Sequence, residues 1–207
     1  IPIEVNDSAE HRALALKMAQ ASIVLLKNAD DALPLDKGAL KKIAVVGPNA
    51  DDAVVLLGNY NGFPSASVTP LAGIRNKAGD AVEVAYARGC DISSDDTSGF
   101  DEAVAVARDA DVVIAVVGLS QLIEGEEGQR EGVEEGKRST GDREDLDLPG
   151  VQEELLKALH ETGRPLIVVL VNGSAVAVNW AGEHAAAILE LWSVSYTHLR
   201  AHETKAN

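Results

Sequence analysis

The chain has 207 residues and a net charge of −15 at pH 7, with 46% hydrophobic, 25% charged and 3% aromatic residues. This length allows one domain with a sizeable core, which must be built from Ala, Val, Leu and Ile because aromatic residues are so few. The negative charge argues against nucleic acid or an anionic membrane surface as a partner, since both would repel the chain. No apolar run reaches the roughly 18 residues that a membrane span needs.

The cysteine content and the first residue further limit the kind of protein that this chain can be. Cys90 is the only cysteine, which excludes an internal disulfide and a thiolate metal cluster. The chain opens on Ile1, without a methionine or a signal-peptide pattern, so we expect it to be a piece of a longer protein.

The first predicted element is a helix over residues 8–26. Ser8 is a suitable N-cap, and apolar residues recur at helical spacing along the segment: Leu14, Met18, Ala21 and Leu25. Pro34 disfavours helix at the residue before it, so an extended connector is expected there.

Short apolar runs then alternate with helical segments to the end of the pattern. Buried strands are predicted at residues 42–46, 82–86, 111–117, 165–171 and 186–191. Helices are predicted at residues 70–77 (after a Thr69 cap), 100–108, 149–161 and 175–180. Strands alternating with helices form βαβ units, so we expect an α/β fold, a Rossmann-like three-layer sandwich with a mostly parallel sheet of five or six strands.

The segment of residues 118–148 interrupts this alternation. Between residues 120 and 147 it holds ten acidic and four basic residues and almost no apolar periodicity. Structureless connections longer than about 12–15 residues are normally functional or disordered. Because this one follows the most apolar strand, it is predicted to lie outside the carboxyl ends of the strands, where α/β folds place their chemistry.

Several kinds of site are disfavoured by the motifs. The first strand ends in Gly47-Pro48-Asn49, without the glycine-rich loop that cradles a nucleotide phosphate, and the chain has no G-x-S-x-G nucleophile elbow. The five histidines are dispersed, so no metal site and no cofactor is predicted, although the acidic segment leaves binding of a hard cation open. Of the kinds of chemistry considered, acid/base catalysis by carboxylates remains as the candidate.

Several motifs, in one order along the chain, resemble the second domain of glycoside hydrolase family 3. They are Ser22-Ile-Val-Leu-Leu-Lys-Asn28, Ile43-Ala-Val-Val-Gly-Pro-Asn-Ala50, Gly58-Asn-Tyr-Asn-Gly62, Glu124-Gly-Glu-Glu127, Gly141-Asp-Arg143 with Leu148-Pro149, and Val171-Asn-Gly-Ser-Ala175. The bacterial β-xylosidase and β-glucosidase branch is the most similar. The resemblance covers residues 8–192.

The resemblance implies a retaining exo-β-glycosidase in which a (β/α)8 barrel precedes this α/β sandwich and the active site lies between the two. The barrel, absent here, would supply an aspartate nucleophile, and the acidic segment would supply the general acid/base glutamate. In the family that glutamate follows a glycine in this loop, which points to Glu126, with Glu127 and Glu124 as fallbacks. The implied substrate is a β-linked xylo- or gluco-oligosaccharide or an aryl glycoside. The isolated chain is expected to be inactive.

Two further expectations complete the prediction. The rival to a glycosidase is a stand-alone acidic α/β module that binds a partner through the acidic segment without catalysis. Residues 1–192 are expected to be the family's domain, as a fragment, whereas residues 193–207 lack any periodicity, resemble translated sequencing-adapter sequence, and are predicted to be a non-native tail.

Overall fold

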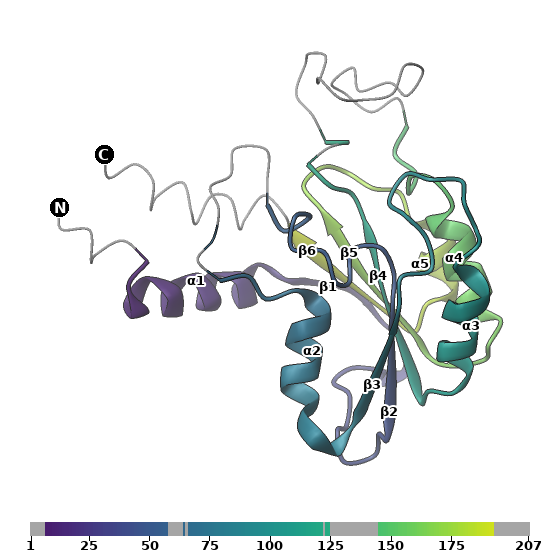
Figure 1. Cartoon of the computed structure of the whole chain (residues 1–207), viewed down its shortest axis with the longest axis horizontal. Helices are drawn as coiled ribbons and strands as arrows, with labels where there is room; N and C mark the ends of the chain where they lie inside the picture. The colour runs from purple at the N-terminus through teal and green to yellow at the C-terminus, as the bar shows by residue number, and fades with distance from the viewer. Residues whose placement is uncertain (1–6, 58–63, 65, 122, 125–144, 193–207) are drawn as a thin grey trace.

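The protein folds around one six-stranded sheet in which every strand pair but one is parallel. The computed structural model describes residues 7–57, 64, 66–121, 123–124 and 145–192. The strands are β1 (Val24–Asn28), β2 (Lys42–Val46), β3 (Glu83–Ala87), β4 (Val112–Gly118), β5 (Leu166–Asn172) and β6 (Ala187–Trp192). Their order is β1-β6-β5-β4-β2-β3, and only β1 runs antiparallel to its neighbour (Figure 1). The predicted fold class, a mostly parallel three-layer α/β sandwich, is confirmed.

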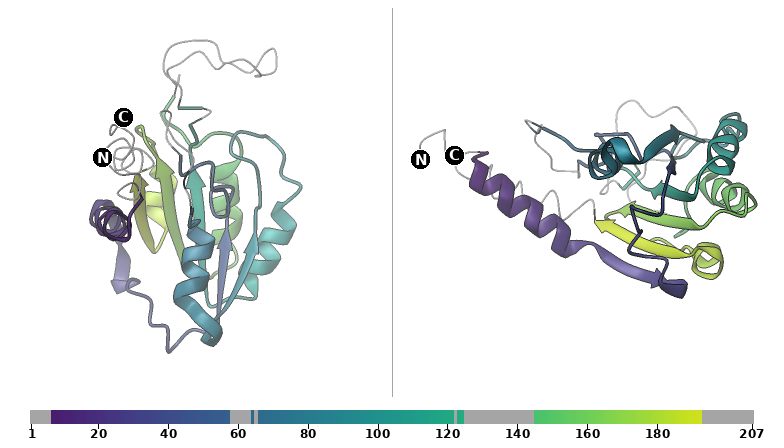
Figure 2. Two further views of the ribbon diagram at one scale, coloured as in Figure 1. Left: turned by 60° about the vertical axis from the view of Figure 1, so that its left-hand side comes forward. Right: turned by 90° about the horizontal axis from the view of Figure 1, so that it is seen from below.

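Helices cover the two faces of the sheet. The described helices are α1 (Ala9–Ser22), α2 (Pro70–Ala78), α3 (Phe100–Arg108), α4 (Gln152–His160) and α5 (Asn179–His184), with short 3-10 turns at Ala29–Asp31 and Gly79–Ala81. Helices α3, α4 and α5 pack on one face and α2 on the other (Figures 1 and 2).

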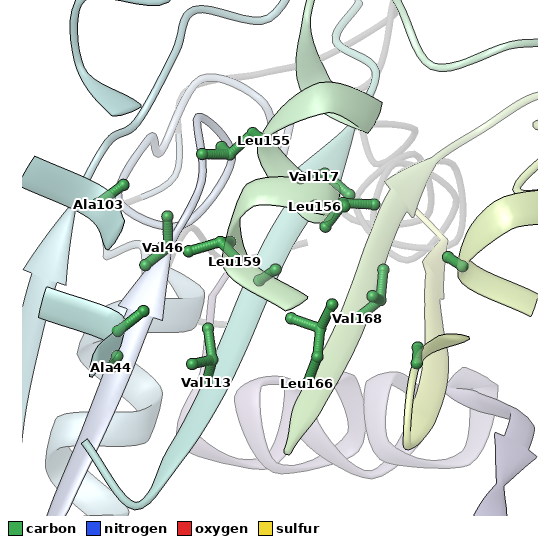
Figure 3. Close-up of a cluster of buried hydrophobic side chains, with 14 of the residues drawn as sticks. Ala44, Val46, Ala103, Val113, Val117, Leu155, Leu156, Leu159, Leu166 and Val168 are labelled. Carbon is green, nitrogen blue, oxygen red and sulfur yellow. The ribbon is translucent and has the colours of Figure 1, made fainter. Parts of the chain in front are cut away.

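Alternation along each strand divides the core into two layers. On β4, Val113 and Val117 face α3 and α4, whereas Val112 and Val116 face the side of α2. The α3–α4 layer contains three fully buried leucines of α4 that pack on the strands (Figure 3): Leu155, Leu156 and Leu159. Burying a leucine side chain stabilises a fold by roughly 1.5–3 kcal/mol, so this row is a main attachment of α4 to the sheet.

Most of these elements begin and end within a residue or two of the predicted boundaries, because local sequence signals determine them. The Thr69 side chain accepts a hydrogen bond from the N–H of Ala72 at 3.2 Å, and Pro70 occupies the first turn of α2. The strands predicted at residues 42–46 and 165–171 are observed at the same place or shifted by one residue.

The predicted helix over residues 8–26 is too long. Ser8 caps α1 as expected, accepting from the N–H of His11 at 3.2 Å, but the helix ends at Ser22. Residues Val24–Asn28 instead form β1, which pairs with β6 through Val24 opposite Glu190 and Asn28 opposite Ala187. Two β-branched residues at this point and a free edge of β6 favour strand over helix continuation.

The apolar stripe of α1 is not buried either. No residue of this helix is buried, and Leu14, Leu16 and Met18 are 55%, 61% and 47% exposed. Figure 2 shows α1 extending away from the sheet, so its spacing of apolar residues does not mark a core face within the described part of the chain.

Two smaller differences concern α4 and α5. Helix α4 begins at Gln152, after a turn at the predicted start. The short helix predicted at residues 175–180 is found at Asn179–His184, and residues 175–178 are not helical. The predicted tail, residues 193–207, lies outside the described residues. None of the described helices combines the length and the apolar composition that a membrane span requires.

Candidate functional site

The candidate site lies at the carboxyl ends of the parallel strands, where the connection from β4 to α4 begins. Strand β4 ends at Gly118, which has a φ of +143°. A Cβ placed on Gly118 would lie 2.1 Å from the carbonyl oxygen of Val171 on β5, so only glycine fits. The acidic connection therefore starts where the backbone of Gly118 is in close contact with the neighbouring strand, β5.

The side chain of Gln152, at the start of α4, fixes this starting point. Its Oε1 accepts from the N–H of Gly118 at 2.8 Å, and its Nε2 donates to the carbonyls of Gly118 and Ile92 at 2.8 and 2.7 Å. Gln152 is completely buried, and the bonds satisfy both ends of its carboxamide. One side chain thus ties together the end of β4, the segment after β3 and the first turn of α4.

A second buried carboxamide approaches from β2. Asn49, fully buried in the turn after that strand, donates from Nδ2 to the carbonyl of Leu119 at 2.7 Å. Its Oδ1 has no hydrogen-bond partner among the described residues. Asn49 thus holds the turn after β2 to the backbone that follows β4.

The acidic connection then makes a tight turn that presents Glu124. The carbonyl of Ser120 accepts from the N–H groups of both Ile123 and Glu124 at 3.0 Å. This turn directs the Glu124 side chain back toward the end of β5.

There the Glu124 carboxylate meets three donors. Its Oε1 accepts from the N–H of Gly173 at 2.8 Å, the N–H of Ser174 at 2.6 Å and the hydroxyl of Ser174 at 2.7 Å. Two successive backbone N–H groups in a turn form a concavity that binds anions, and here the anion is a glutamate 50 residues earlier in the chain.

Residues of β5 and β6 stabilise the turn at Gly173 and Ser174. Asn172, the last residue of β5 and 2% exposed, donates from Nδ2 to the carbonyl of Ser174 at 2.9 Å and to the carboxylate of Glu190 at 2.8 Å. Asn172 therefore links the turn at Gly173 and Ser174 to both strands.

The far end of the acidic connection returns to the same segment. The N–H of Ala177 donates to the carbonyl of Leu146 at 2.7 Å, and Asp147 forms a parallel bridge with Ala177. Both flanks of residues 125–144 are therefore attached to residues 173–177, which follow β5.

Of the three predicted acid/base candidates, the structure describes one. Glu124 lies at the carboxyl end of the sheet, as expected, whereas Glu126 and Glu127 lie outside the described residues. Sequence reasoning missed that Gly173 and Ser174 receive Glu124. The Asn-Gly-Ser turn at a strand end was the available signal, because such turns expose consecutive N–H groups.

Two further observations concern a cysteine and the arrangement of possible metal ligands. Cys90 is buried, and burial raises the pKa of its thiol to about 11, so it is a poor nucleophile near neutral pH. Among the residues that the structure describes, no three or more His, Cys, Asp or Glu side chains gather as they would around a metal ion.

Comparisons with known proteins agree with this architecture. The chain is 43% identical over 204 residues to a β-xylosidase of Formosa agariphila, covering 96% of this chain and 26% of the relative. It is 37% identical to a periplasmic β-glucosidase of Salmonella typhimurium, covering 92% of this chain and 26% of the relative. The chain thus spans about a quarter of the length of the relatives that it matches.

Solved structures show the same fold. A β-glucosidase from Erythrobacter marinus superposes with a TM-score of 0.76 at 33% identity, over 98% of this chain and 29% of its own. A GH3 exo-β-xylosidase, solved with a xylobiose aziridine probe, gives 0.75 at 32% identity, over 95% and 24%. The sequence profile of the glycosyl hydrolase family 3 C-terminal domain matches residues 23–201. By these matches the chain belongs to glycosyl hydrolase family 3, as a C-terminal domain of that family.

Proposed function

We propose that the chain is the sandwich domain of a retaining exo-β-glycosidase, a β-xylosidase or β-glucosidase, and that it supplies the general acid/base glutamate. The observation that carries the proposal is the match over almost the whole chain to relatives named β-xylosidase and β-glucosidase. The substrates would be xylosides or glucosides with a terminal β-linked sugar, including aryl glycosides.

The proposed division of labour follows from the chemistry. A retaining glycosidase needs two carboxyl groups about 5–5.5 Å apart, one as nucleophile and one as proton donor and acceptor. The nucleophile would come from a barrel domain of the full-length enzyme, and Glu126 of this chain would be the acid/base, with Glu127 and Glu124 as the other candidates. The position of the β4–α4 connection at the carboxyl edge of the sheet supports this assignment.

The experiment uses a chimera in which this chain replaces the matching 26% of the Formosa agariphila β-xylosidase. In the chimera, Glu126→Ala should lower turnover of substrates with poor leaving groups by about 10²–10⁴-fold, the usual contribution of a positioned proton donor. Activated aryl xylosides need little acid in the first step, so their covalent intermediate should accumulate. Azide, which needs no general base, should restore turnover and yield the β-xylosyl azide.

Glu127→Ala and Glu124→Ala are the matched controls. Azide rescue of one of these and not of Glu126→Ala would move the role to that residue. If none of the three variants differs from the parent chimera, the acid/base assignment to this segment is wrong and the binding-module alternative gains support. The isolated chain should not hydrolyse aryl xylosides or glucosides, and turnover that depends on one of these glutamates in the isolated chain would contradict the division between two domains.

A further inference from the structure

We infer that Glu124 is a positioning residue that anchors the start of the acidic segment to the turn after β5, and that it is not the proton donor. The inference deepens the proposed function and rests on it for its catalytic consequence. Its structural part stands on contacts within this chain alone.

The contacts define Glu124 as an acceptor. A single oxygen, Oε1, takes hydrogen bonds of 2.6–2.8 Å from two N–H groups and the hydroxyl of Ser174. A general acid must instead direct a proton at the leaving oxygen of the sugar. In this geometry Oε1 of Glu124 is directed at protein donors on the β5 turn.

The receiving turn is itself held firmly. Asn172 is buried at the end of β5 and bridges the carbonyl of Ser174 and the carboxylate of Glu190 on β6. Since two central strands fix this turn, it provides a rigid support, and a side chain bound to it inherits its position.

The turn also lies where both flanks of the acidic segment converge. Glu124 attaches the entry to Gly173 and Ser174, and Leu146 attaches the exit to Ala177, three residues after Ser174. The proposed acid/base, Glu126, is only two residues along the chain from Glu124, a span of at most about 7 Å. Fixing Glu124 therefore limits where the acid/base can lie relative to the sheet.

The first test uses this chain and measures amide hydrogen exchange by NMR. Glu124→Ala should speed exchange of the Gly173 and Ser174 amides at least about 10-fold, while the Val168 amide in the middle of β5 is unchanged. Glu124→Gln keeps an acceptor oxygen and should preserve much of the protection. Ser174→Ala removes only the hydroxyl, so the two backbone amides should stay protected. Equal exchange of both amides in the parent chain and Glu124→Ala would overturn the anchor.

The second test uses the chimera. Glu124→Ala should lower kcat by up to about 100-fold, the effect of misplacing a catalytic group by about 1 Å. Azide should not restore the activity of Glu124→Ala. The Glu124→Gln variant should keep its activity, because glutamine retains the acceptor but cannot act as an acid. Azide rescue of Glu124→Ala, or inactivity of Glu124→Gln with the amides still protected, would show that Glu124 is the acid itself. If the parent chimera has no activity, the proposed function fails, and the exchange experiment still decides the anchor.

Discussion

The carboxamide of Gln152 spans both polar groups of Gly118, accepting from its N–H and donating to its carbonyl, each at 2.8 Å. Gly118 ends β4 and Gln152 begins α4, so these bonds join the two ends of the acidic connection 34 residues apart. A backbone that leaves a sheet edge and is buried must find such partners, because an unpaired buried N–H or C=O group is costly.

Replacing Gln152 by leucine should therefore destabilise the protein strongly. The change keeps the side-chain size but leaves the N–H of Gly118 and the carbonyls of Gly118 and Ile92 without their partner, at about 1–3 kcal/mol for each unsatisfied group. Urea unfolding followed by circular dichroism should show a loss of about 3 kcal/mol or more. Glu154→Gln on the exposed side of the same helix is the control and should stay within about 0.5 kcal/mol. Equal stability of the two variants would contradict this role of Gln152.

Alanine should have opposite effects at two glycines. Gly118→Ala places a Cβ 2.1 Å from the Val171 carbonyl oxygen at a φ of +143°, so the free energy of unfolding should fall by roughly 3 kcal/mol or more. Gly182 lies inside α5 with nothing within 4 Å of the added atom, and Gly182→Ala should stabilise by up to about 1 kcal/mol. Thermal unfolding of both variants checks the pair, and a tolerated Gly118→Ala would mean that the strand ends can separate.

The exposed apolar residues of α1 should tolerate polar replacement in this chain. Leu14→Gln and Met18→Gln remove apolar side chains that are about half exposed, so each should change stability by less than about 0.5 kcal/mol. Leu156→Ala, in the fully buried row of α4, should cost about 2–5 kcal/mol in the same urea titration. Comparable losses for the three variants would show that α1 packs on the body of the protein in solution.

Asp111, just before β4, should make the protein sensitive to acid. Its carboxylate accepts from the N–H groups of Lys42 and Lys41, at 2.9 and 2.7 Å, and these hydrogen bonds lower its pKa below the ordinary 3.8. Because the folded-state pKa is the lower one, the stabilisation is present above about pH 4 and disappears as the pH falls through the folded-state value.

The melting temperature of Asp111→Ala should accordingly lie below that of the parent chain by a constant amount between pH 5 and 7, and the difference should shrink below pH 3.8. Asp95→Ala, which replaces an exposed aspartate, is the control variant in the same measurements. A difference for Asp111→Ala that is the same at pH 3 and pH 6 would contradict the assignment.

Local sequence patterns are enough to predict the parallel core of this protein. The segments that form β2, β4 and β5 are apolar on both faces, a pattern typical of strands that are covered on both sides. Thr69 and Pro70 mark the start of α2 through contacts within one turn. These signals are local, so a single sequence carries them. The acidic composition after β4 likewise placed Glu124 at the carboxyl edge of the sheet.

Features that depend on partners far away in the chain become visible only once the chain is folded. Val24–Asn28 continues a helical pattern but becomes a strand because β6, more than 150 residues later, offers it a hydrogen-bonding edge. Leu14 has the spacing of a core residue, yet it is 55% exposed and its helix has no buried residue. The attachment of Glu124 to Ser174 joins residues 50 positions apart, and no periodicity records it, because hydrogen bonds between turns are set by how the strands that end in them are ordered in the sheet.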